Sequence, residues 1–218
     1  MRIAVLDHQL RFPHPREATL EGLVAIGGDL SVDRLLLAYR SGIFPWTIDP
    51  ITWWSPEPRA IFEFDQFHVS RSLERAIQKG GFQITIDKVF GQVMEGCAAP
   101  ARGRRTTWIS GEFIEAYARL YEHGNAHSVE CWQGGALVGG IYGVAIGGFF
   151  AGESMFHRVS NASKVALTHL QGHLQERGFV LFDIQMITPV TAQLGASMIP
   201  REEYLGRLNE AISKPCHF

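Results

Sequence analysis

The heptapeptide FVLFDIQ, Phe179–Gln185, places two polar side chains inside the strongest strand pattern of the chain. Its other residues are all apolar, which is typical of a buried central strand. Because side chains alternate along a strand, Asp183 and Gln185 are expected on the same face as Leu181. A carboxylate on this strand loses its hydration, and this is costly unless a partner or a substrate compensates its charge. The pair therefore predicts a reacting centre or, alternatively, a structural aspartate held by an arginine and backbone amides.

The segments around this strand predict a mixed α+β sheet. Gly134-Gly135 is typical of a hairpin turn, and Gly178 is placed to end a long helix just before the central strand. Successive strands followed by a helix and a further central strand are typical of an α+β domain. We expect helices over 70–79, 88–97, 112–122, 160–177, 191–194 and 201–212, and strands over 82–86, 126–132, 137–146, 149–151 and 179–185.

The first part of the chain has a different texture, rich in turn formers and aromatic residues. Its motifs are FPHP at 12–15, GGDLS at 27–31, IFPW at 43–46 and WWSPEP at 53–58. Only one helix fits there, with Ser31 as its cap and Gly42 as its end. We therefore expect a small irregular N-terminal domain over 1–62 and a larger domain over 63–218.

The composition limits the classes of protein to which this chain can belong. The chain has 218 residues, 46% of them hydrophobic, and a formal net charge of -2. It can bury a substantial core, and it exerts no general electrostatic pull on nucleic acid, so binding of that kind needs a local basic patch. The three cysteines form no CxxC pair, the N-terminus lacks a signal-like apolar run, and glycines interrupt the longest apolar stretch. A soluble, cytoplasmic protein without membrane association is expected.

Two patterns that suggest cofactor chemistry are weak. His169 and His173 lie four residues apart on an expected helix, a spacing that suits one metal ion, but no third ligand is nearby. The glycine pairs at 139–140 and 147–148 lack the Lys-Ser/Thr ending of a phosphate loop and are typical of hairpins. We therefore expect neither a metal nor another cofactor.

Basic and aromatic residues suggest a surface for nucleic acid. Arg71, Arg75 and Lys79 recur every four residues and would form one stripe on a helix. The motif RGRR at 102–105 contributes Arg102, Arg104 and Arg105. Both groups are able to bind phosphates, although each also fits an ordinary solvated face. Trp46, Trp53, Trp54 and Trp108 could stack on unpaired bases or pack between the two domains.

Six motifs in this order resemble one family, and the resemblance spans about residues 12–208. The chain is similar to the bacterial leucyl/phenylalanyl-tRNA-protein transferases. This likeness implies a larger domain with an N-acetyltransferase-like (GNAT) fold, in agreement with the mixed sheet. The motifs are GGDL at 27–30, GIFPW at 42–46, WWSP at 53–56, GESMF at 152–156, NASK at 161–164 and DIQ at 183–185.

The resemblance also implies an activity. Such an enzyme moves leucine or phenylalanine, with methionine left open, from aminoacyl-tRNA to the α-amino group of a protein. The implied acceptors begin with Arg or Lys, and the transfer marks them for degradation in the N-degron pathway. An aminoacyl ester is already activated, so no cofactor is needed. Two alternatives stay open: an acyltransferase of the same fold with another acyl donor, and a non-catalytic tRNA- or peptide-binding module.

Residue roles are carried over motif by motif. Asp183 and Gln185 match the catalytic acid and amide, and Glu153 matches an acid that orients the reacting groups. Trp46 and Trp108 match aromatic residues near the terminal adenosine. Gln185 is expected to hold the attacking amine while Asp183 orients it or receives charge. The implied pocket for the transferred side chain comprises Ile141, Phe150, Met155, Leu170, Leu174 and Phe182.

Overall fold

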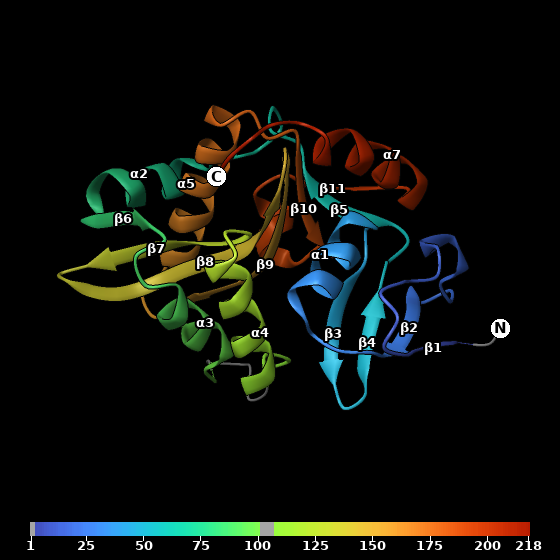
Figure 1. The fold of residues 1–218 in the computed structure, drawn as a ribbon. Helices are drawn as coiled ribbons and strands as arrows, with labels where there is room; N and C mark the ends of the chain where they lie inside the picture. Colours follow the sequence, from blue (N-terminus) through green and yellow to red (C-terminus); the bar gives the residue numbers. More distant parts are fainter. Residues whose placement is uncertain (1–2, 101–106) are drawn as a thin grey trace.

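The computed structural model describes residues 3–100 and 107–218 (Figure 1). The predicted basic cluster Arg102, Arg104 and Arg105 lies outside the described residues. The first part of the chain forms a four-stranded sheet in the order β1-β2-β4-β3. Its elements are β1 (Ala4–Leu6), the 3-10 helix η1 (Pro15–Glu17), β2 (Leu23–Gly27), α1 (Val32–Arg40), β3 (Phe44–Ile48) and β4 (Ile51–Trp54).

The second sheet is larger and mixed. Seven strands follow the order β11-β5-β10-β9-β8-β7-β6, and the neighbours are antiparallel except for β9 and β10, which are parallel. The strands are β5 (Arg59–Phe62), β6 (Phe82–Ile86), β7 (Ala126–Gln133), β8 (Ala136–Ile146), β9 (Phe149–His157), β10 (Leu181–Gln185) and β11 (Ala196–Ile199).

Helices cover both faces of this sheet (Figure 1). Helix α5 packs on β7, β8 and β9, with α2 against it, while α3 and α4 pack on β8, β9 and β7. Helix α7 contacts β9 and β10 and also α1 of the first sheet. The helices are α2 (Arg71–Lys79), α3 (Phe90–Ala98), α4 (Gly111–Glu122), α5 (Ala162–Glu176), α6 (Pro189–Gln193) and α7 (Arg201–Ile212).

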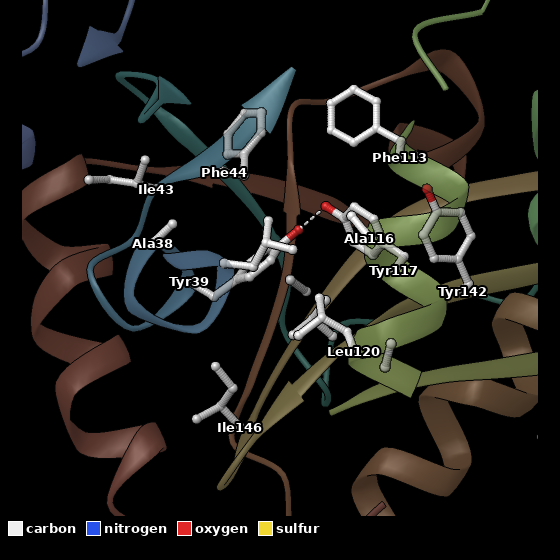
Figure 2. Close-up of a cluster of buried hydrophobic side chains, with 14 of the residues drawn as sticks. Ala38, Tyr39, Ile43, Phe44, Phe113, Ala116, Tyr117, Leu120, Tyr142 and Ile146 are labelled. Carbon is white, nitrogen blue, oxygen red and sulfur yellow. Dashed lines mark hydrogen bonds between the residues drawn. The ribbon is translucent and has the colours of Figure 1, made fainter. Parts of the chain in front are cut away.

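The two sheets share one hydrophobic core. Leu35, Tyr39 and Trp53 of the N-terminal part belong to the same buried cluster as Phe113 and Tyr117 of α4. Figure 2 shows Tyr39 and Tyr117 pointing toward each other across this contact, with their hydroxyl groups hydrogen-bonded. The N-terminal part is therefore packed against the larger sheet through apolar side chains and one buried polar link.

Most elements predicted from the sequence are confirmed, but the N-terminal part is more regular than expected. It contains four paired strands in addition to the expected helix α1. The Ser31 side chain caps α1 as predicted, accepting a hydrogen bond from the backbone N–H of Arg34. Strand β11 was also missed. The chain leaves the first sheet after Trp54 and enters the second sheet at Arg59. The domain boundary expected at residue 62 remains a prediction.

The length and composition of the helices bear on whether the chain could cross a membrane. Within residues 3–100 and 107–218, none of the helices combines the length and the apolar character that crossing a bilayer demands.

A glycine in β8 provides a test of this packing. A Cβ atom on Gly143 would lie 2.5 Å from the Phe150 ring and would overlap the carbonyl oxygen of Ala151. We expect Gly143→Ala to lower the free energy of unfolding by about 1–3 kcal/mol, because the buried backbone must shift. Gly172 in α5 has open space around it, so Gly172→Ala should instead stabilise by about 0.5–1 kcal/mol. Urea unfolding of both variants checks this; equal effects would contradict it.

Candidate active site

The side chains of Glu153 and Gln185 meet at the wall between two cavities. The amide nitrogen of Gln185, Nε2, donates a hydrogen bond of 3.0 Å to Oε1 of Glu153. Both residues line a cavity of about 240 Å³ on one side and a cavity of about 260 Å³ on the other. Ile184, Met186 and Thr188 also border both cavities. A ligand that filled both would therefore pass directly over the carboxylate and the amide.

Irregular strand pairing brings these two side chains together. On β9, Gly152 pairs with Gly143 and Ser154 pairs with Tyr142, which leaves Glu153 as the extra residue of a bulge. On β10, the register shifts between Asp183 and Gln185. The pairing of β9 with β10 ends at Ala151 and Asp183. Bulges of this kind re-aim a side chain, and here they place the two polar groups where the neighbouring strands cease to pair.

Gln185 adopts a backbone conformation that is rare for a residue with a side chain. Its φ angle is 57°, in the left-handed region. The backbone N–H of Gln185 donates a 2.9 Å hydrogen bond to Oδ1 of Asp183, an aspartate-to-backbone link that stabilises such a turn. Asp183 therefore fixes the backbone that presents the Gln185 side chain.

Asp183 itself is buried and fully engaged. Its exposed fraction is 0%. Arg59 binds both carboxylate oxygens, with Nε at 2.9 Å and Nη2 at 2.7 Å, and the hydroxyl of Tyr204 donates a third bond of 2.9 Å. The carboxylate of Asp183 raises the pKa of Arg59 above its ordinary value, against the opposing effect of burial.

The prediction that Asp183 projects into the same cleft as Gln185 is therefore wrong. Asp183 borders neither of the two cavities. The alternation rule fails at this point because the bulge adds a residue and Gln185 leaves the extended conformation. The other interpretation of the heptapeptide, a structural aspartate held by an arginine and a backbone amide, matches the observed contacts.

Glu153 lies in an unusual electrostatic setting. The hydroxyl of Tyr117 donates a 3.2 Å hydrogen bond to its Oε2 atom, and Tyr117 is in turn bonded to Tyr39. Burial raises the pKa of Glu153 to about 7, and the negative charge of Asp183 adds to this rise. The hydroxyls of Tyr39 and Tyr117 and the charge of Arg59 oppose it. A carboxylate with this pKa can exchange protons near neutral pH.

The smaller cavity is aromatic. Trp46 and Trp108, both predicted to lie near an adenosine, line it together with Phe44. Trp46 is held edge-to-face by Trp54 at 5.4 Å, and Trp108 by Phe113 at 5.1 Å. Two indoles fixed in this way offer flat surfaces on which a base can stack.

The second cavity contains only part of the predicted side-chain pocket. Ile141 and Met155 line it, together with Leu167, Ile184 and Thr191, which the sequence did not single out. The other four predicted residues are not among the described residues that line it. Phe150, Leu170, Leu174 and Phe182 are at most 1% exposed and belong to the core cluster that includes Ile141. They support the pocket from behind in this structure.

The predicted basic stripe is present on α2. Arg71, Arg75 and Lys79 are all exposed, at the spacing expected for one helical face. Helix α2 packs against α5, and β6, which follows it directly, is the edge strand. Strands β7, β8 and β9 lie between that edge and β10. The stripe is therefore remote from Gln185 and suits the body of a large ligand better than its reacting end.

Other polar residues near the site escaped the sequence analysis. Arg59 precedes the apolar run AIF, so a cation at the start of a buried strand was a usable signal for the partner of Asp183. Tyr39 and Tyr117 gave no signal, because tyrosines at helical spacing also fit a core. Among the described residues no group of three or more His, Cys, Asp or Glu side chains is arranged to hold a metal ion.

Family models match most of the chain. The leucyl/phenylalanyl-tRNA protein transferase model covers residues 61–209, and the model of the N-terminal domain of the same proteins covers residues 28–57. Proteins named leucyl/phenylalanyl-tRNA--protein transferase include one from Nitrosospira multiformis, 52% identical over 93% of this chain and 89% of its own. One from Shewanella pealeana is 50% identical over 93% of this chain and 88% of its own.

Solved structures show weaker likenesses. The structure of L-PGS from Bacillus licheniformis is 16% identical, with a TM-score of 0.45 over 72% of this chain and 53% of that chain. A GCN5-related N-acetyltransferase from Kribbella flavida is 12% identical, with a TM-score of 0.41 over 76% of this chain and 59% of its own. These scores are too low to support an argument about the site.

The buried ion pair predicts a strong coupling. Removing either partner, as in Arg59→Met or Asp183→Leu, leaves an uncompensated buried charge and should cost about 3–5 kcal/mol. The double variant should lose less than the sum of the two, because no charge remains unpaired. Urea unfolding at pH 7 measures all three. Arg16→Met, which removes an exposed pair with Glu202, is the control and should cost about 1 kcal/mol or less. Additive losses would contradict this account.

The raised pKa of Glu153 predicts a pH-dependent stability. The folded chain holds this proton up to about pH 7, whereas the ordinary value is 4.5, so Glu153 makes the fold less stable as pH rises through that window. Glu153→Gln removes this loss. Relative to the natural chain, it should gain up to about 3 kcal/mol between pH 5 and pH 8. Urea unfolding at both pH values measures the difference. Glu210→Gln, an exposed carboxylate on α7, should show no such gain.

Proposed function

Because the chain belongs to the leucyl/phenylalanyl-tRNA protein transferase family and is an aminoacyltransferase, we propose that it moves leucine or phenylalanine from tRNA to a protein. The acceptor is the α-amino group of a chain beginning with Arg or Lys, which is thereby marked for the N-degron pathway. The observation that carries the proposal is the Glu153–Gln185 pair between an aromatic and an apolar cavity. Aminoacyl-adenosine has the same two parts on either side of its reactive ester.

The donor fits these cavities part by part. The terminal adenine would stack between Trp46 and Trp108, and the aminoacyl side chain would enter the cavity lined by Ile141, Met155 and Leu167. Each methylene placed in an apolar pocket contributes about 1–3 kcal/mol to discrimination, which favours Leu, Phe and Met over Ala. The core residues behind this pocket, such as Phe182, then set its depth.

The acceptor amine would be held by Gln185 and deprotonated by Glu153. Because Nε2 of Gln185 donates to Glu153, its amide oxygen is free to accept a hydrogen bond from the amine. The amine attacks the ester carbonyl, so that a C–N bond forms and the bond to the ribose oxygen breaks. Glu153, with a pKa of about 7, takes the proton released by the amine. The same proton can then be passed to the leaving ribose oxygen.

Asp183 would act through Gln185 and does not touch substrate in this scheme. Its carboxylate is shielded by Arg59 and Tyr204 and reaches the site only through the backbone N–H of Gln185. We therefore assign it a positioning role. The stripe of Arg71, Arg75 and Lys79 would contact the backbone of the tRNA body, in a salt-sensitive manner. Charged tRNA as the donor implies a cytoplasmic location.

Transfer assays test the proposal directly. We expect labelled Leu, Phe and Met to pass from tRNA to peptides that begin with Arg or Lys, and not to peptides that begin with Asp or Ala. Glu153→Gln should lower kcat about 100-fold, the usual contribution of a positioned base, with little change in KM for tRNA. Gln185→Ala should also lower kcat, while Gln193→Ala, an exposed amide on α6, serves as control.

Two outcomes would count against this scheme. Absence of transfer from every charged tRNA would remove the proposed function itself. A loss confined to KM in the Glu153 and Gln185 variants would leave the function but remove the chemical roles of these two residues.

A further inference from the structure

A third cavity adjoins the site and is not used by the scheme above. It has a volume of about 410 Å³ and lies where β9 ends and α5 begins. Met155 lines both this cavity and the apolar cavity beside Glu153. Val190 of α6 borders it as well, and the next residue, Thr191, borders the apolar cavity. The two spaces are therefore direct neighbours that share a wall.

The lining of this third cavity is positively charged. Arg158 and Lys164 contribute the charge, His157 lies beside them, and no Asp or Glu is among the described residues that line the cavity. This contrasts with the whole chain, whose formal net charge is -2. A concave surface lined by one sign of charge attracts ligands of the opposite sign. The chemistry of the cavity therefore points to an anion.

Several hydrogen-bond donors in the cavity have no partner within the described chain. The ammonium of Lys164, which is half-buried, takes part in no ion pair or side-chain hydrogen bond there. Asn161 has a left-handed φ of 69° and its side chain does not cap α5. The backbone N–H groups of Ser163 and Lys164 likewise donate to no described acceptor. Hydrogen-bond donors that lack a partner in a cavity are suited to a ligand with several acceptor oxygens.

Two further contacts hold the rim of the cavity in place. The guanidinium of Arg158 donates a 3.2 Å hydrogen bond to the carbonyl of Leu137 and lies 5.5 Å from the Phe156 ring centre. Nδ1 of His157 lies 3.5 Å from the hydroxyl of Ser163, which is 5% exposed. The free amides at the start of the 15-residue helix α5 add a positive partial charge to these side chains.

We infer that this cavity binds a backbone phosphate of the 3′ end of the donor tRNA. The inference rests on the proposed function, since it takes the esterified nucleotide to lie beside Glu153. Successive residues of a strand rise by about 3.3 Å, so His157 lies roughly 13 Å along β9 from Glu153. The 5′ phosphate of the terminal nucleotide is joined to the ester oxygen through the ribose, and the next phosphate lies one nucleotide further along, so a backbone phosphate falls within that reach. Phosphate contacts of this kind fix the register of a nucleic acid without reading its sequence.

The test compares two donors that differ only in phosphate. Phenylalanyl-adenosine has the ester and the base but no phosphodiester, whereas a phenylalanyl trinucleotide ending in CCA carries its backbone phosphates. Lys164→Gln should raise KM for the trinucleotide about tenfold, the effect expected for losing one charge-assisted hydrogen bond. It should leave KM for phenylalanyl-adenosine and kcat for both donors unchanged. Lys164→Arg should recover much of the loss.

Matched controls separate this effect from general charge and from folding. Lys214→Gln removes one exposed positive charge elsewhere and should leave both KM values unchanged. Urea unfolding should show that Lys164→Gln folds like the natural chain, since the ammonium has no partner to lose among the described residues. The slope of log KM against log salt for the trinucleotide should become shallower by about 0.7, the loss of one single-strand phosphate contact.

The possible outcomes are distinct. If the natural chain transfers from neither donor, the proposed function fails. If it transfers from both and Lys164→Gln changes both KM values equally, or neither, the phosphate site is refuted while the function stands. If inorganic phosphate binds in a manner that depends on Lys164 and the trinucleotide KM does not change, the cavity takes a free anion and the inference is overturned.

Discussion

The buried pair of Arg59 and Asp183 is the interaction on which the rest of the site depends. Its two hydrogen bonds join β5 to β10, and Arg59 also reaches the carbonyl of Gly42 and the hydroxyl of Tyr204. One guanidinium thus links both sheets and α7. Burying two charges is costly, so such a pair is poor evidence for added stability. Its clearer consequence is geometric: Oδ1 of Asp183, which accepts from Arg59, also accepts from the backbone N–H of Gln185 and so fixes its left-handed turn.

The same arrangement accounts for the state of Glu153. The negative charge of Asp183 raises the pKa of Glu153, and the charge of Arg59, which is paired with Asp183, opposes this with a smaller effect. What remains, together with burial, holds the pKa of Glu153 near 7. The N-terminal sheet contributes here as well. Tyr39 of α1 is hydrogen-bonded to Tyr117 (Figure 2). Tyr117 donates to Glu153, and Trp46 of β3 lines the aromatic cavity.

Sequence reasoning succeeded where periodicity is long and failed where a single residue breaks it. The helices on the larger sheet and the strands β7, β8 and β10 follow from alternation, caps and Gly178. The N-terminal strands are only three to five residues long and contain Pro45, so no alternation can develop. The bulges at Glu153 and Gln185 leave no mark in the residue types, yet they decide which side chains meet. Phe150 and Phe182 illustrate the same limit: their apolar character cannot distinguish a pocket wall from the core behind it.

In the proposed scheme, strand β9 would contact several parts of one substrate. The bulge frees Glu153 from the ladder, after which regular pairing resumes from Ser154 to His157. Met155 and His157 therefore share a face, so an apolar side chain and an imidazole follow the carboxylate in order along the strand. An aminoacylated nucleotide has an apolar side chain on the acyl side of its ester and a phosphate on the ribose side, and both branches start near the ester. Because all three proposed contacts would come from one rigid element, the backbone would set their spacing.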